Sequence, residues 1–119
     1  MKTYLDLVAE ARPHVSLLPL SDVDRALTQA PLLIDVREES EYAAGHLPGA
    51  VHMSRGTVEA RLGAIPAGQV PETPLLLYCR TDARATLVAL SLQSMGYIRV
   101  QVIEGGHAAW VAAGKPLAN

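Results

Sequence analysis

Residues 75–84 read Leu-Leu-Leu-Tyr-Cys-Arg-Thr-Asp-Ala-Arg and contain the only cysteine of the chain, Cys79. The apolar run at 75–78 has the length of a buried strand, and polar residues begin directly after it. Residues 83–95 have a helix-forming composition, so residues 79–84 are predicted to form a loop that enters a helix. The backbone N–H groups at a helix start attract anions, and the thiolate of Cys79 is such an anion. Chemistry is therefore expected at Cys79.

The charged residues around Cys79 bear on its acidity. Arg80 and Arg84 supply cations which, together with a helix start, lower the pKa of a cysteine. Asp82 opposes them, because a carboxylate about 6 Å from a thiolate costs about 3 kcal/mol at an effective dielectric constant near 20, and under about 1 kcal/mol in water. Two arginines and the helix dipole outweigh one aspartate. The sequence therefore predicts a positive cradle and a lowered Cys79 pKa.

Length and composition exclude several classes of protein. The chain has 119 residues, half of them hydrophobic, which suits one domain with a single core. A net charge of -2 gives no basic field for nucleic acid or for an anionic membrane surface. No stretch has the length and apolar character of a signal peptide or a membrane span, so a cytoplasmic location is expected. A single cysteine excludes an internal disulfide, and no metal site or cofactor is expected.

Short apolar segments alternate with helical ones along the chain. The expected strands cover residues 15–18, 32–36, 50–53, 75–78 and 100–103, and the expected helices residues 3–12, 22–29, 40–44, 57–62, 83–95 and 107–113. This alternation predicts an α/β fold, with a five-stranded parallel sheet and helices on both faces. Ligands bind at the carboxyl ends of such strands. The residues expected to converge there are Arg37, Ser54, Arg55, the loop at 79–84 and Glu104.

The chain is divided here into an N-terminal helical extension, residues 1–13, and a single domain, residues 14–119. The extension is expected to end at Pro13, which cannot continue a helix. Two roles stay open for it: a lid packed on the domain, or a contact in a homodimer.

Four motifs appear in succession. Residues 33–38 read Leu-Ile-Asp-Val-Arg-Glu, residues 41–50 Glu-Tyr-Ala-Ala-Gly-His-Leu-Pro-Gly-Ala, residues 78–84 Tyr-Cys-Arg-Thr-Asp-Ala-Arg, and residues 104–110 Glu-Gly-Gly-His-Ala-Ala-Trp. In this order they resemble the motifs of the rhodanese family. The resemblance implies a rhodanese-like fold and a sulfurtransferase activity. It implies that Cys79 takes a sulfane sulfur from a small donor such as thiosulfate, holds it as a persulfide, and passes it to a thiol, to cyanide or to a sulfur-relay protein.

The cysteine loop (residues 79–84) has six residues, which resembles the loop of sulfurtransferases and not the seven-residue loop of the related dual-specificity phosphatases. The family's loop usually has glycine at the position of Asp82. Aspartate tolerates the left-handed backbone region, so it is expected to keep the loop's shape while adding a charge that repels an anionic donor. Replacing Asp82 by glycine is therefore expected to lower the KM for thiosulfate.

The remaining motif residues are assigned to two groups. The donor is expected to meet the loop residues Arg80, Thr81, Asp82, Ala83 and Arg84, with Arg55 as a further cation at the rim. Arg84 has two open roles: pairing with an oxyanion of the donor, or locking the loop to Asp35 or Glu104. Structural roles, such as an ion pair between Asp35 and Arg37 and a turn at His46, are expected for Asp35, Arg37, Glu41, His46, Glu104, Gly105 and Trp110.

Three functions stay open at this point. The first is a single-domain sulfurtransferase, favoured by the cysteine and the loop length. The second is a sulfur-binding or regulatory module on the same fold with little turnover, which the charge of Asp82 supports. The third is a phosphatase or an arsenate reductase, against which stand the short loop and the absence of a second thiol.

Overall fold

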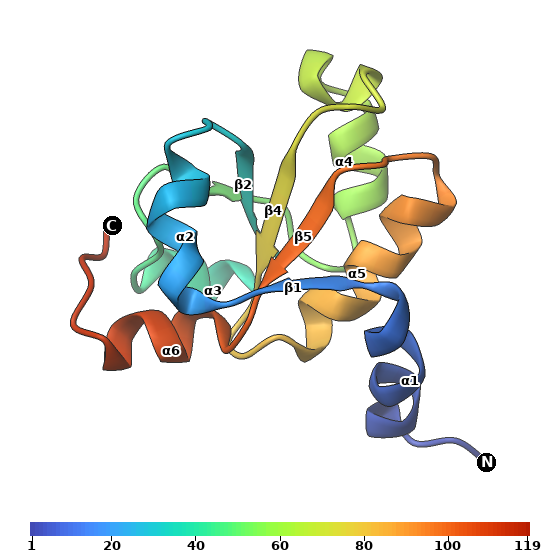
Figure 1. The fold of residues 1–119 in the computed structure, drawn as a ribbon, viewed down its shortest axis with the longest axis horizontal. Helices are drawn as coiled ribbons and strands as arrows, with labels where there is room; N and C mark the ends of the chain where they lie inside the picture. The colour runs from blue at the N-terminus through green and yellow to red at the C-terminus, as the bar shows by residue number, and fades with distance from the viewer.

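Five strands form one sheet in which every neighbouring pair is parallel (Figure 1). This computed structural model gives the structure of residues 1–119. In their order across the sheet the strands are β1 (Ser16–Leu18), β5 (Val100–Ile103), β4 (Leu75–Tyr78), β2 (Leu32–Asp35) and β3 (Val51–His52). The predicted α/β fold with a five-stranded parallel sheet is confirmed.

Strand β4 lies at the centre of the sheet, paired with β2 on one side and β5 on the other. All four of its residues are buried, as the apolar run predicted. Because side chains alternate along a strand, Leu75 and Leu77 enter one core cluster while Leu76 and Tyr78 enter the other. This central position places Cys79, the next residue, at the middle of the sheet's carboxyl edge.

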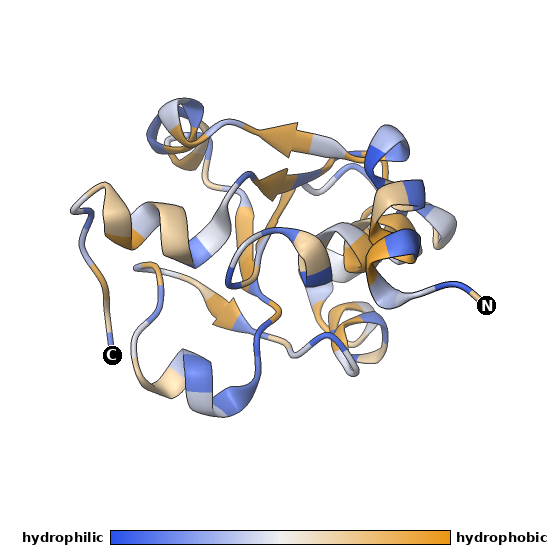
Figure 2. Cartoon of the chain, turned by 90° about the horizontal axis from the view of Figure 1, so that it is seen from below, coloured by the Kyte–Doolittle hydropathy of each residue, from blue (hydrophilic) through white to orange (hydrophobic).

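Helices cover both faces of the sheet (Figure 1). The helices are α1 (Tyr4–Ala11), α2 (Leu20–Leu27), α3 (Glu39–Ala43), α4 (Val58–Gly63), α5 (Ala83–Ser94) and α6 (Gly106–Ala112), with short 3₁₀ turns η1 (Arg12–His14) and η2 (Pro66–Gln69). The first core cluster holds side chains of α4 and α5, and the second holds side chains of α2 and α6. Figure 2 shows the strands largely hydrophobic between helices of mixed character. None of the helices is long and apolar enough to cross a membrane.

The element boundaries follow the predicted pattern closely, with one clear shift. Helix α2 begins at Leu20, two residues before the predicted start, with Pro19 at its N-cap position. Proline fits this position, because the N-cap residue has an extended backbone and its N–H makes no bond within the helix. The turn η2 falls between the helix expected at residues 57–62 and the strand expected at residues 75–78.

The N-terminal helix α1 packs against α5. Its cap is complete, because the Thr3 hydroxyl accepts from the backbone N–H of Asp6 and the Asp6 carboxylate accepts from the N–H of Thr3. Val8 and Ala11 are buried, whereas the larger apolar side chains of Tyr4 and Leu7 stay about half exposed. The helix therefore contacts the rest of the domain through a narrow stripe formed by Val8 and Ala11.

Candidate active site

Cys79 lies at the carboxyl end of β4, in the loop that leads into α5, as predicted. Only 1% of its surface is exposed, and it belongs to the core cluster on the α5 face. The backbone N–H groups of Ala85, Arg84 and Thr81 make hydrogen bonds that favour the thiolate. The start of α5 thus provides the expected backbone cradle for an anion on the sulfur.

The acidity of Cys79 differs from the sequence prediction. Burial raises the pKa of the thiol, and the N–H groups and the positive charge of Arg84 lower it by less. The expectation of a lowered Cys79 pKa is therefore wrong. Its physical cause is desolvation, which disfavours the charged thiolate in a site almost closed to water.

Helix α6 closes the cysteine loop from the other face of the sheet. The N–H of His107 donates to the Cys79 carbonyl at 2.9 Å, and the N–H of Ala108 donates to the Arg80 carbonyl at 2.9 Å. Gly106 permits this approach, since a Cβ there would overlap the carbonyl oxygens of both Thr81 and Cys79. The loop is thereby fixed to a helix that is more than twenty residues away along the chain.

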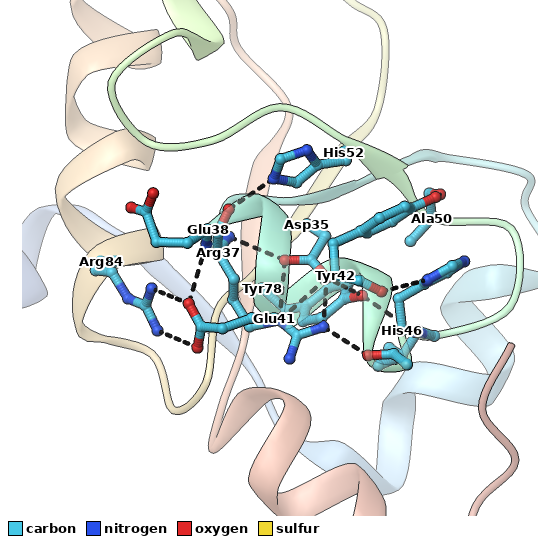
Figure 3. Close-up of polar contacts among 12 residues, drawn as sticks. Asp35, Arg37, Glu38, Glu41, Tyr42, His46, Ala50, His52, Tyr78 and Arg84 are labelled. Atoms are coloured by element: carbon cyan, nitrogen blue, oxygen red, sulfur yellow. Dashed lines mark hydrogen bonds and ion pairs between the residues drawn. The ribbon is translucent and has the colours of Figure 1, made fainter. Parts of the chain in front are cut away.

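Arg84 locks the cysteine loop to α3. Its guanidinium donates two hydrogen bonds to Glu41, at 2.7 Å to Oε1 and 3.2 Å to Oε2 (Figure 3). The hydrogen bond from Arg84 lowers the pKa of Glu41 to about 2. Of the two roles open for Arg84, the structure supports locking, but the partner is Glu41 and not Asp35 or Glu104. An arginine held this way by both nitrogens is not free for a donor oxyanion.

Behind the loop, Asp35 and Arg37 form the structural ion pair that the sequence predicted, with 2.8 Å between Arg37 Nη2 and Asp35 Oδ2. The Tyr78 hydroxyl donates to Asp35 at 2.7 Å and accepts from the N–H of Leu47 at 3.1 Å (Figure 3). Arg37 also donates to the Gly45 carbonyl. Burial lowers the pKa of Arg37, but the hydrogen bond and charge of Asp35 raise it overall. Both ions are more than nine-tenths buried, so Arg37 lies behind the edge of the sheet as part of its support.

Asp82 does not occupy the conformation expected for it. Its φ is -145°, outside the left-handed region, so this position does not require the backbone freedom of glycine. One carboxylate oxygen pairs with Nη2 of Arg12 at 2.6 Å, and the other accepts from the N–H of Gly105 at 3.1 Å. The negative charge of Asp82 is therefore compensated by a residue from the N-terminal segment.

The remaining predicted residues occupy the rim or the supporting layer. Arg80, Thr81, Arg55 and Glu104 are exposed, and Ala83 begins α5. His46 stacks on the Tyr42 ring at 3.8 Å between centroids and binds the Tyr42 carbonyl through Nδ1 (Figure 3). Gly105 adopts a φ of 77° before α6, and buried Trp110 donates to the Pro116 carbonyl. These contacts support a structural part for His46, Gly105 and Trp110.

Sequence reasoning missed three contributors to this edge. Arg12 lies 70 residues from Asp82, and no motif links the two. The Tyr78 hydroxyl was detectable as the one polar group at the end of an apolar strand. His107, directly after Gly106, contributes the backbone N–H that donates to the Cys79 carbonyl. Burial, followed by the charge of Arg37, lowers the pKa of its imidazole.

Comparison with known proteins gives consistent matches. A family model described as rhodanese-like domain matches residues 20–113. A sulfurtransferase from Allochromatium vinosum is 32% identical over 90 residues, which are 76% of this chain and 80% of that protein. A thiosulfate sulfurtransferase from Tolumonas auensis is 36% identical over 87 residues, covering 71% and 78% of the two chains.

Solved structures resemble the fold over most of the chain. A protein of unknown function from Rhodopseudomonas palustris, described as a possible tyrosine phosphatase, has a TM-score of 0.88 at 28% identity, and the match covers 99% of this chain and 96% of that one. A rhodanese-like domain from Anabaena has a TM-score of 0.77 at 25% identity, with 87% and 78% coverage.

Proposed function

The chain belongs to the rhodanese-like domain family and is a sulfurtransferase of the rhodanese type, and from this premise we propose that Cys79 carries the transferred sulfur. The observation that supports this role is the cradle of three backbone N–H groups around the sulfur, from Thr81, Arg84 and Ala85. Such donors stabilise an anion without any side-chain ordering. A persulfide is an anion of this kind.

The proposed reaction has two steps and no net redox change. The Cys79 thiolate, its proton lost to solvent, attacks the outer sulfur of thiosulfate, so that a new S–S bond forms and sulfite leaves with the electron pair of the broken bond. A thiolate or cyanide then attacks the outer sulfur of the persulfide, and the Cys79 thiolate leaves. Storing the sulfur covalently divides one difficult transfer into two easier ones.

The rim cations Arg80 and Arg55 are exposed and suit the recruitment of a small anionic donor. We assign the physiological acceptor to the class of thiols, either a small thiol or a sulfur-relay protein, in the cytoplasm. The locked Arg84 also argues against a phosphatase, because the arginine that would bind a phosphate is already held by Glu41.

Intact-mass spectrometry after incubation with thiosulfate tests the proposal. We expect a gain of one sulfur in the wild-type protein, its loss on adding cyanide or a thiol, and no gain in Cys79→Ala. Absence of the gain with thiosulfate and with an uncharged persulfide donor would contradict the carrier role.

A sulfur-binding module with little turnover is the second candidate. The observation that favours it is the burial of Cys79, with 1% of its surface exposed and a raised pKa. Steady-state turnover separates the two candidates: a module takes up one sulfur and releases it slowly to cyanide, whereas an enzyme repeats the cycle.

A further inference from the structure

The N-terminal segment (residues 1–14) borders the edge of the sheet that carries the cysteine loop. Val8 and Ala11, each 2% exposed, anchor α1 against α5, the helix that the loop enters (Figure 1). The Arg55 guanidinium lies 5.8 Å from the centre of the Tyr4 ring, a cation–π distance. The segment therefore meets the loops after two different strands, and Arg12 follows directly from the buried Ala11.

Both carboxylate oxygens of Asp82 are occupied. Arg12 holds Oδ1 at 2.6 Å and the N–H of Gly105 holds Oδ2 at 3.1 Å, and the Asp82 side chain is only 13% exposed. The Arg12 guanidinium is the only cation that pairs with the Asp82 carboxylate. The carboxylate is thus fixed in place by α6 and neutralised by the N-terminal segment.

The pairing sets the charge that the cysteine loop presents. Within the loop, Arg84 is neutralised by Glu41 and Asp82 by Arg12, so Arg80 is the only charged side chain without an ion-pair partner. The loop then offers one uncompensated positive charge to an incoming anion. Without Arg12, the charge of Asp82 would cancel that of Arg80.

We propose that Arg12 is a specificity-determining residue, which keeps the cysteine loop attractive to an anionic sulfur donor by cancelling the charge of Asp82. This inference deepens the proposed function and rests on it where the donor is concerned. The electrostatic effect on Cys79 itself does not depend on sulfur transfer. It also assigns the N-terminal segment, which precedes the family match at residues 20–113, a part in the site.

Alkylation of Cys79 by iodoacetate, an anion, and by iodoacetamide, its neutral analogue, measures this effect directly in the full-length protein. Arg12→Met removes the charge and keeps much of the side chain's length. At low salt we expect the ratio of the two rates, iodoacetate over iodoacetamide, to fall about threefold to tenfold, the effect of one charge at about 6 to 8 Å in a largely aqueous setting. The KM for thiosulfate is expected to rise by a similar factor, with a smaller change in kcat.

Three companion variants isolate the charge. Asp82→Asn added to Arg12→Met is expected to return the ratio to the wild-type value, and Arg12→Lys to keep it within about twofold. Arg25→Met removes an arginine from the exposed pair with Asp22 on α2 and is expected to leave the ratio unchanged. Raising the salt from about 0.01 M to about 1 M shortens the screening length from roughly 30 Å to roughly 3 Å and should remove the difference.

The outcomes distinguish a failure of the role inferred for Arg12 from a failure of the proposed sulfur transfer. If Arg12→Met slows both reagents equally, Arg12 only supports the loop and the inference is overturned. If Cys79 resists both reagents in the native protein, the comparison uses the thiosulfate concentration at which half of the sulfur mass gain is reached. Equal concentrations for the wild type and Arg12→Met would then overturn the inference. A lowered ratio with no sulfur uptake in any variant would instead refute the proposed function and leave the charge effect standing.

Discussion

At the sulfur of Cys79, burial and hydrogen bonding act in opposite directions on one proton. Burial favours the neutral thiol, whereas the N–H groups of Ala85, Arg84 and Thr81 favour the anion. Burial prevails in the free protein. A persulfide carries its charge on a second sulfur, one atom beyond the buried Cys79 sulfur, so we expect the loaded state to ionise more readily than the free thiol.

The pH dependence of alkylation tests the balance at Cys79. Because the thiolate is the reacting form and the pKa is raised, the iodoacetamide rate should climb with a midpoint above about pH 8.5, the value of a free thiol. Replacing Arg84 by methionine removes a charge that favours the thiolate, and the midpoint should move further upward. A midpoint below that of a free thiol would show that desolvation does not dominate.

A second residue-scale prediction concerns Glu41. Its folded pKa of about 2 lies below the ordinary value of 4.5, so the ion pair with Arg84 stabilises the fold above about pH 4.5 and this contribution is lost as the pH falls towards about 2. Glu41→Gln should therefore lower the free energy of unfolding by about 1 kcal/mol at neutral pH. The gap between wild type and variant should shrink steadily in urea titrations below about pH 4.5. A gap that is independent of pH would contradict an ionic origin.

At the scale of elements, the site depends on α6 as much as on the loop that carries Cys79. Gly106 begins this helix and lets its backbone reach the loop carbonyl groups. The φ of Gly106 is 53°, which adds to the steric reason for glycine. The contact fixes the loop's shape without using any side chain.

Gly106→Ala is expected to destabilise the protein by about 3 kcal/mol or more, because the new methyl group must displace the backbone at Thr81 and Cys79. Gly114→Ala is the matched control. Its φ is 73°, but nothing lies within 4 Å of the new Cβ, so it should cost only about 1 kcal/mol. Urea unfolding of both variants gives the comparison, and equal losses would mean that the close approach is unimportant.

Elements defined by local pattern were predictable, and contacts between distant segments were not. Strand β4 and strand β5 match their predicted bounds, because each is a short apolar run between polar residues. The partner of Arg84 was missed since Glu41 is 43 residues away along the chain, and the sequence pattern does not show which acidic residue packs beside the arginine. The predicted direction of the Cys79 pKa shift was wrong for a related reason. The prediction counted the nearby charges and ignored burial, which only the packed structure reveals.

At the scale of the whole molecule, one buried polar cluster ties the sheet to the surrounding loops. Asp35 at the end of β2 and Tyr78 at the end of β4 meet Arg37, which reaches the Gly45 carbonyl, while the Tyr78 hydroxyl holds the N–H of Leu47 (Figure 3). The cluster thus fixes the segment between α3 and β3 to the middle of the sheet.

Asp35→Asn should cost about 3 to 5 kcal/mol, because it leaves the Arg37 charge buried without its partner. Tyr78→Phe should cost about 1 to 3 kcal/mol, because it removes the hydrogen bonds to Asp35 and from Leu47 and leaves the Leu47 N–H unpaired. Adding Arg37→Met to Asp35→Asn should recover part of the loss. As a control, Asp22→Asn breaks an exposed pair with Arg25 and should change the stability by less than about 1 kcal/mol. If Asp35→Asn or Tyr78→Phe lowered the free energy of unfolding by no more than this control, the cluster would not be important for stability.

The order of the strands also governs how the chain assembles while the ribosome is still making it. Strand β1 pairs only with β5, and the side chains of Ser16 and Gln101, which meet across these strands, are 85 residues apart. Strands β2, β3 and β4 can associate earlier, but β1 has no neighbour until residues 100–103 have left the exit tunnel. The stretch of the sheet synthesised first is consequently the last to be hydrogen-bonded into place.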